Sequence, residues 1–128
     1  MTTRREAIAT TALAAGALLA GCTTFKGETK MVKHVILWKL KDDIADKAAV
    51  KAGIKSGLEG LKGQVPGLVD IRVNTEGLAS SNADVMLDST FESEAALKGY
   101  AVHPAHVAVA DAKVRPFTET RLCLDFAC

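Results

Sequence analysis

Residues 32–41, VKHVILWKLK, are apolar on both faces if they form a β-strand, and no other segment constrains the fold as strongly. The segment is rich in the β-branched and aromatic side chains that favour strands. Side chains alternate between the faces of a strand, so one face would carry His34, Ile36, Trp38 and Leu40, and the other Val35 and Leu37. A sheet built around such a strand must be covered on both sides.

A helix that can cover one of these sides is expected next. Asp46 can serve as its N-cap, and Gly63 followed by Pro66 ends it. Its apolar residues recur at spacings of three and four and form one stripe, made of Val50, Ile54, Leu58, Leu61 and Val65. The lysines of this segment lie mostly off the stripe and form a solvated face.

Three more strands and two shorter helices are expected further along the chain. In order, they are a strand at 69–75, a strand at 84–91, a helix capped by Ser93 and running through Tyr100, a helix from Pro104 to about Val114 that Pro116 ends, and a strand at 118–126. The order β-α-β-β-α-α-β predicts an α+β sandwich of the ferredoxin-like kind, with its helices on one face of the sheet.

The second face of that sheet would be left bare, although the first strand is apolar on this side too. Exposed apolar patches of this size mark interfaces. We therefore expect a two-fold homodimer in which sheet packs against sheet.

The first 21 residues are expected to be a removable export signal. Arg4 and Arg5 precede the uncharged residues 7–21, which are fewer than the roughly 20 needed to span a bilayer. The segment ends in Leu-Ala-Gly-Cys, which resembles the cleavage site of bacterial lipoproteins and makes Cys22 the predicted lipidation site. Both the general secretory and the twin-arginine routes remain open. The alternatives are a buried Ala-rich helix and a translation start at Met31.

The remainder of the chain is expected to be a short tether, residues 22–30, and one domain, residues 31–128. Subtracting the two arginines and one glutamate of the signal from 16 basic and 15 acidic residues leaves 14 of each, so the exported part is formally neutral. Neutrality argues against a nucleic-acid partner. We expect a location in the cell envelope, with membrane contact only through the lipid on Cys22, or a cytoplasmic one if translation starts at Met31.

The cysteines predict neither a disulfide within the domain nor a metal site. Cys123 and Cys128 are separated by an odd interval, so their side chains would lie on opposite faces of one strand. The chain has no zinc-type cysteine spacing and no glycine-rich nucleotide loop, so neither a metal nor a cofactor is predicted. A metal held by His103, His106 and Asp125 is the weaker alternative.

All three histidines lie where they could do chemistry. His34 is on the first strand, and His103 and His106 flank Pro104, shortly after Tyr100. His106 falls in the first turn of a helix, where the positive end of the dipole lowers the pKa of an imidazole and favours its neutral form. A neutral imidazole beside a phenol can move a proton on and off a carbonyl compound. The alternative is that these side chains are core residues satisfied by the protein itself.

Three segments resemble a known family. The opening MVKHVILWKL, the segment YAVHPAHV and the closing LCLDF are similar to the stress-responsive A/B-barrel family, and the resemblance covers residues 31–126. It implies a β-α-β-β-α-α-β unit that pairs its sheets into a barrel across a homodimer. In a plant polyketide cyclase of that family, the essential Tyr and His lie in a Tyr-x-x-His-Pro-Ala-His segment, which Tyr100 and His106 match here.

The resemblance implies a role for each candidate residue. His106 would be the general base that takes a proton from a carbon next to a carbonyl, and Tyr100 would hydrogen-bond the developing enolate. His34 and His103 would contact the substrate, and Asp125 would orient an imidazole.

Three functions are consistent with these observations. The first is an exported protein that binds a small apolar or carbonyl-containing ligand, with or without weak lyase or isomerase activity. The second is a non-catalytic stress protein of the cell envelope, and the third is a polyketide cyclase. A pocket of about 300 Å³ or more reached by Tyr100 and His106 would favour the first, and a filled interior with both groups satisfied would favour the second.

Overall fold

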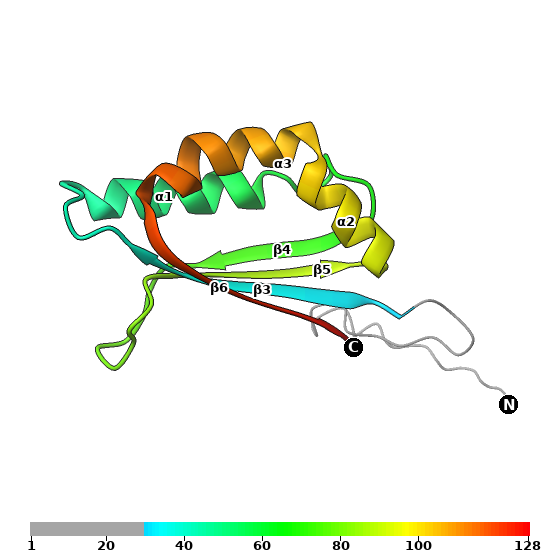
Figure 1. The fold of residues 1–128 in the computed structure, drawn as a ribbon, viewed down its shortest axis with the longest axis horizontal. Coiled ribbons are helices and arrows are strands. Elements are labelled where there is room, and N and C mark those ends of the chain that lie inside the picture. The colour runs from blue at the N-terminus through cyan, green and yellow to red at the C-terminus, as the bar shows by residue number, and fades with distance from the viewer. Residues whose placement is uncertain (1–29) are drawn as a thin grey trace, which may run out of the picture.

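The computed structural model describes residues 30–128 of the chain. The expected export signal, the lipidation site Cys22 and all but the last residue of the tether lie outside the described residues. Within residues 30–128, helices pack on one face of a four-stranded sheet (Figure 1). No helix in this part of the chain is long and apolar enough to cross a membrane.

The elements follow one another as the sequence predicts. They are β3 (Val32–Leu40), α1 (Lys47–Glu59), β4 (Leu68–Asn74), β5 (Val85–Phe91), α2 (Glu94–Val102), α3 (Pro104–Val109), a π-helix (Ala110–Val114), a 3₁₀ turn (Arg115–Phe117) and β6 (Thr118–Ala127). This is the ferredoxin-like α+β arrangement, so the expected fold class is confirmed.

The sheet has the strand order β4-β5-β3-β6, and each neighbouring pair is antiparallel. β3 is therefore a central strand, and β6 lies at the edge beside it. The register places His34 opposite Ser89 on β5 and opposite Asp125 on β6. Residues 91 positions apart in the chain thus become direct neighbours on one face of the sheet.

α1 and α2 begin at their predicted caps, but α1 ends earlier than expected. The Asp46 carboxylate accepts a hydrogen bond from the Ala49 amide, and the Ser93 hydroxyl accepts one from the Ala96 amide. α1 stops at Glu59 rather than near Gly63, because the Leu61 and Lys62 amides bond only three residues back, to the Leu58 and Glu59 carbonyls. Gly63, with a φ of 89°, then turns the chain away. The chain continues through turns that keep the end of the apolar stripe buried.

The helical segment that begins at Pro104 runs to Val114 as predicted, but its second half is not a regular α-helix. Regular α-helix ends at Val109, and the chain continues as a π-helix in which the Arg115 amide donates to the Ala110 carbonyl. Pro116 has no amide hydrogen to continue a regular helix. The wider turns bury Ala110 and Val114 against the sheet and carry the chain to Arg115.

The two faces of the sheet differ as the alternation of β3 predicts. Ile36, Trp38 and Leu40 are buried beneath the helices. On the opposite face, Leu122 and Leu124 of β6 are 63% and 65% exposed. The domain therefore has a covered face with a core and an uncovered face with an apolar strip.

Candidate functional site

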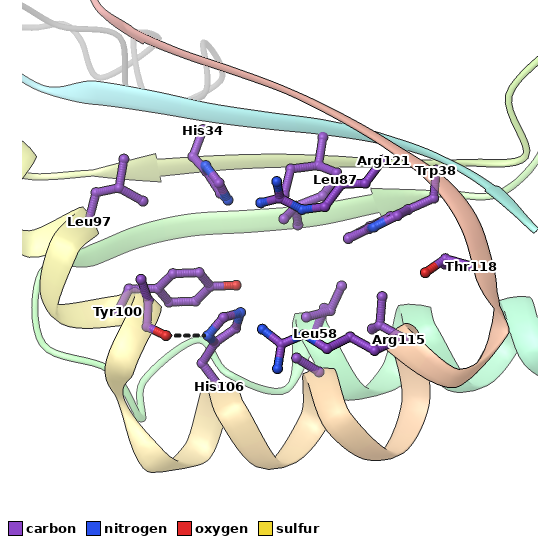
Figure 2. A pocket seen from close by; sticks show the side chains of 14 residues that line it. His34, Trp38, Leu58, Leu87, Leu97, Tyr100, His106, Arg115, Thr118 and Arg121 are labelled. Carbon is purple, nitrogen blue, oxygen red and sulfur yellow. Dashed lines mark hydrogen bonds between the residues drawn. The ribbon is translucent and has the colours of Figure 1, made fainter.

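A cavity of about 190 Å³ lies between the helices and the β3–β6 half of the sheet (Figure 2). Residues from both layers line it: His34, Ile36, Trp38, Leu58, Leu87, Leu97, Tyr100, Ala101, His106, Ala110, Val114, Arg115, Thr118 and Arg121. Most of these side chains are apolar, and the polar ones converge from different elements. This is the usual composition of a small-molecule site.

Tyr100, in the last turn of α2, presents a buried hydroxyl to this cavity. The residue is 1% exposed, and its ring packs against Phe91 with the ring centres 4.9 Å apart. Burial raises the pKa of the phenol, so the hydroxyl keeps its proton. The hydroxyl oxygen has no hydrogen-bond partner among residues 30–128. Buried hydroxyls are nearly always paired, so this one is available to a ligand.

His106, in the first turn of α3, stacks against Tyr100 with the ring centres 4.1 Å apart. Its Nδ1 lies 3.3 Å from the Ala101 carbonyl oxygen, shown by the dashed line in Figure 2. A carbonyl can only accept, so Nδ1 carries the hydrogen and Nε2 has a free lone pair. His106 is half-buried, and Figure 2 shows its ring directed into the cavity.

The pKa of His106 lies below its usual value, in the predicted direction but for a different reason. Burial is the largest cause, and the nearby cationic groups of Arg115 and Arg121 lower the pKa further. The hydrogen bond to Ala101 opposes this shift. At neutral pH the ring is therefore an uncharged base.

His34 points into the cavity from β3 (Figure 2). Asp125 on β6 holds its ring in place. His34 Nδ1 and Asp125 Oδ1 are 2.5 Å apart. Its ring lies edge-to-face with Tyr100, with the centres 6.1 Å apart. A carboxylate can only accept, so Nδ1 of His34 donates and Nε2 is left for the cavity. The expected orientation of an imidazole by Asp125 matches this pair.

A wider groove gives access to the cavity from the β6 edge of the sheet. Its volume is about 560 Å³, and it shares His34, Leu97, Ala101 and Arg121 with the cavity. The groove is open to solvent and also reaches Asp125. A ligand can therefore approach along β6 and place one end beside the stacked rings of Tyr100 and His106.

The family follows from comparison with known proteins. A model of the stress responsive A/B barrel domain matches residues 32–128. The chain belongs to this family. Olivetolic acid cyclase from Cannabis sativa is 31% identical over 98 residues, which make up 74% of this chain and 94% of the cyclase.

Solved structures of other proteins share the fold. A dimeric protein of unknown function and ferredoxin-like fold from Bacteroides fragilis is 29% identical, with a TM-score of 0.72 over 79% of this chain and 99% of that one. Hydroxynitrile lyase from Passiflora edulis, 17% identical, superimposes with a TM-score of 0.60 over 77% of this chain and 94% of the lyase. The same fold thus occurs in proteins named as a cyclase and as a lyase.

One cluster in this A/B-barrel domain has the composition of a metal site. Cys123 Sγ lies 3.4 Å from Asp125 Oδ1 and 3.8 Å from His34 Nδ1, so three potential ligand atoms are close together. Desolvation and the Asp125 carboxylate raise the pKa of the Cys123 thiol, which therefore keeps its proton at neutral pH. The thiol is free, in agreement with the expectation that it forms no disulfide with Cys128. The alternative metal ligands that the sequence suggested, His103, His106 and Asp125, do not form such a cluster in residues 30–128.

His103 does not line the cavity, although we expected it to contact the substrate. It is the N-cap of α3, and its Nδ1 accepts a hydrogen bond of 3.1 Å from the Ala105 amide. The ring nitrogen thus satisfies an amide that the helix itself leaves unpaired. We assign His103 a structural role.

Two arginines that line the cavity were not among the predicted site residues. Arg121 lies on the same face of β6 as Cys123 and Asp125, and this shared alternation was the signal that could have revealed it. Arg115 follows the π-helix, and no periodic pattern in the sequence predicts where its side chain points. Both side chains line the cavity.

Proposed function

We propose that this domain binds a small carbonyl compound in the cavity and exchanges a proton with it. One observation carries the proposal: the buried Tyr100 hydroxyl has no partner among residues 30–128 and lies beside the neutral imidazole of His106. An unpaired buried donor next to an uncharged base is costly for the folded protein. A carbonyl oxygen would accept the hydrogen bond from Tyr100 and remove that cost.

The geometry supports a simple proton transfer. His106 Nε2 takes a proton from the carbon next to the carbonyl, and the electrons of the broken C–H bond move onto the carbonyl oxygen. The Tyr100 hydroxyl hydrogen-bonds the enolate oxygen that forms. Return of the proton from His106 to the same or another carbon completes an exchange or an isomerisation.

The size of the cavity limits the ligand. Its volume of about 190 Å³ is smaller than the roughly 300 Å³ that we expected of a binding pocket, so a compound that fits inside is small. An extended polyketide would have to lie partly in the open groove along β6. The cyclase relative supports carbonyl chemistry, and the cavity favours a shorter substrate than a polyketide.

We also propose a homodimer formed by the uncovered face of the sheet. Val35, Leu37, Leu122, Leu124 and Phe126 form an apolar strip across β3 and β6, because register pairs place them side by side. The Bacteroides fragilis relative is described as dimeric, which supports a dimer, and the exposed apolar strip is our reason for choosing this face. Light scattering should give twice the chain mass at micromolar concentration, and Leu124→Lys should give a monomer. A monomeric wild-type protein would contradict the dimer.

Export and lipid attachment at Cys22 are the remaining proposals. They rest on the uncharged residues 7–21 and the Leu-Ala-Gly-Cys sequence that ends them. Mass spectrometry of protein expressed with its own N-terminus should show cleavage before Cys22 and an added lipid, with Cys22→Ser as the control. An unmodified N-terminus beginning at Met1, or a protein that begins at Met31, would contradict the proposal.

A ligand screen tests the binding step. Thermal unfolding of the wild type, His106→Ala and Tyr100→Phe is measured with a panel of small ketones, aldehydes and keto acids. A compound that binds the folded state raises the unfolding temperature of the wild type, and less so that of the two variants. No stabilisation across the panel would instead support a non-catalytic envelope protein.

A further inference from the structure

Two guanidinium groups face the cavity from opposite walls. Arg121 extends from β6 on the sheet side, and Arg115 extends from the end of the π-helix on the helix side (Figure 2). The two side chains flank the space into which Tyr100 and His106 point.

The described residues that line the cavity carry two positive charges and no negative charge. Its lining contains both arginines but no carboxylate among the described residues. Arg115 is paired with Asp111 on its own helical segment, whereas none of the ion pairs between residues 30–128 includes Arg121. Both arginines also lower the pKa of His106, a side chain that lines the same cavity. The empty cavity is therefore a place where a negative charge is favoured.

We propose that the natural ligand carries a carboxylate, held between Arg121 and Arg115, and that it is a small keto acid. This inference rests on the proposed function, which places the carbonyl oxygen at Tyr100. A guanidinium group presents parallel N–H donors that match the two oxygens of a carboxylate. The volume of about 190 Å³ requires that carboxylate and carbonyl be only a few bonds apart.

The carboxylate would fix the ligand in one orientation. With its charge between the two arginines, the carbon next to the carbonyl would lie beside His106, which is on the same wall of the cavity as Arg115. Holding the reacting carbon beside the base is the step that converts binding into proton transfer. The cationic arginines would also stabilise the additional negative charge of the enolate.

Paired ligands separate this inference from the proposed function. Isothermal titration calorimetry compares 4-oxopentanoate and acetoacetate with their methyl esters, which keep the ketone and lose the charge. The wild type should bind each acid about tenfold or more tightly than its ester, since hydrogen bonds to charged groups are the stronger ones. Added salt should weaken the binding of the acids and leave the binding of the esters unchanged.

Matched variants locate the charge recognition. Arg121→Gln and the double variant with Arg115→Gln should lose the preference for the acid, and Arg121→Lys should retain part of it. Arg72→Gln is the control, because Arg72 lies on β4, lines a different pocket and contacts Asp70 instead. All of these arginines are exposed, so the variants should unfold at nearly the wild-type temperature.

Each outcome has a defined meaning. Esters that bind as tightly as acids, with a dependence on Tyr100 and His106, would overturn the carboxylate inference and leave the proposed function intact. Acids that bind Arg121→Gln as well as the wild type would also overturn it. If a phosphate monoester of similar size binds more tightly than the acids, the carboxylate inference is wrong and the arginines recognise a phosphate. Failure of both acids and esters to bind would count against the proposed function as well.

Discussion

The two halves of the helix-covered face are built differently. Under α1, the side chains of Ile54, Ile71 and Val73 are all less than 5% exposed and wholly aliphatic. Under α2 and α3, the layer between helices and sheet contains Tyr100, His34 and a cavity instead. The packed half supplies the stability that allows the other half to keep a void and an unpaired hydroxyl.

The largest expected effect on stability falls in the packed half. Ile54→Ala should lower the free energy of unfolding by about 2–5 kcal/mol, because its side chain is fully enclosed and the void cannot collapse. Urea denaturation measures this change. Ser56→Ala, exposed on the same helix, should stay within about 0.5 kcal/mol of wild type. If Ile54→Ala lowers the free energy of unfolding by less than about 1 kcal/mol, the half under α1 is not tightly packed.

A matched truncation on the cavity side should cost less. Leu97→Ala removes a buried side chain that already borders the void, so fewer contacts are lost than at Ile54. The same urea measurement gives the comparison directly. An equal or larger loss at Leu97 would show that the cavity half is packed as tightly as the other.

Tyr100→Phe should have a smaller effect, of opposite sign. Without a ligand, the change removes a buried hydroxyl that has no partner among residues 30–128, so stability should rise by about 1 kcal/mol. Thermal or urea unfolding measures the gain, and binding of carbonyl compounds should weaken at the same time. A loss of stability would mean that the hydroxyl is a satisfied core group and does not serve a ligand.

The pH dependence of stability should reveal His106. Its pKa is lowered in the folded state, so its contribution is present above the unfolded value of 6.5 and is lost as pH falls through the folded pKa. Wild type should therefore lose more stability than His106→Gln between about pH 7 and about pH 5. The lowered carboxyl pKa values of Glu59 and Asp70 act at more acidic pH. Equal losses in the two proteins would contradict the burial of the imidazole.

The smallest effect should come from Asp125→Asn. The Asp125 side chain is 44% exposed, so loss of its charge beside His34 should cost about 1 kcal/mol or less. Nitrogen chemical shifts of His34 report the state of its ring, and Cys123→Ser is the neighbouring control. If added zinc shifts His34 in the wild type and not in Cys123→Ser, the three side chains form a metal site rather than an orienting pair.

More of the fold than of the candidate site could be predicted from the sequence. The alternation in residues 32–41 predicts a strand, and the apolar stripe from Val50 to Val65 predicts a helix. Both patterns can be recognised within the segment itself. The early end of α1 and the π-helix before Pro116 depend on how the turns pack against the sheet. Local pattern does not contain that information.

The placement of the candidate site residues was predicted in part. Tyr100 and His106 do meet, and His34 does meet Asp125, as the resemblance to the family implied. His103 was included because a His-Pro-Ala-His segment does not distinguish a ligand-contacting ring from a helix cap. The arginines were missed because the direction of a long side chain is set by its rotamer and its surroundings.

Exchange of hydrogen for deuterium next to a carbonyl tests most directly whether Tyr100 and His106 act together. A ketone or keto acid that stabilises the protein is incubated in heavy water, and loss of its C–H signal is followed by proton NMR. The account predicts exchange that is faster with the wild type than with buffer, and slower by about 10²–10⁴-fold with His106→Gln. Tyr100→Phe should also exchange more slowly. Equal exchange rates for wild type and His106→Gln would contradict the account.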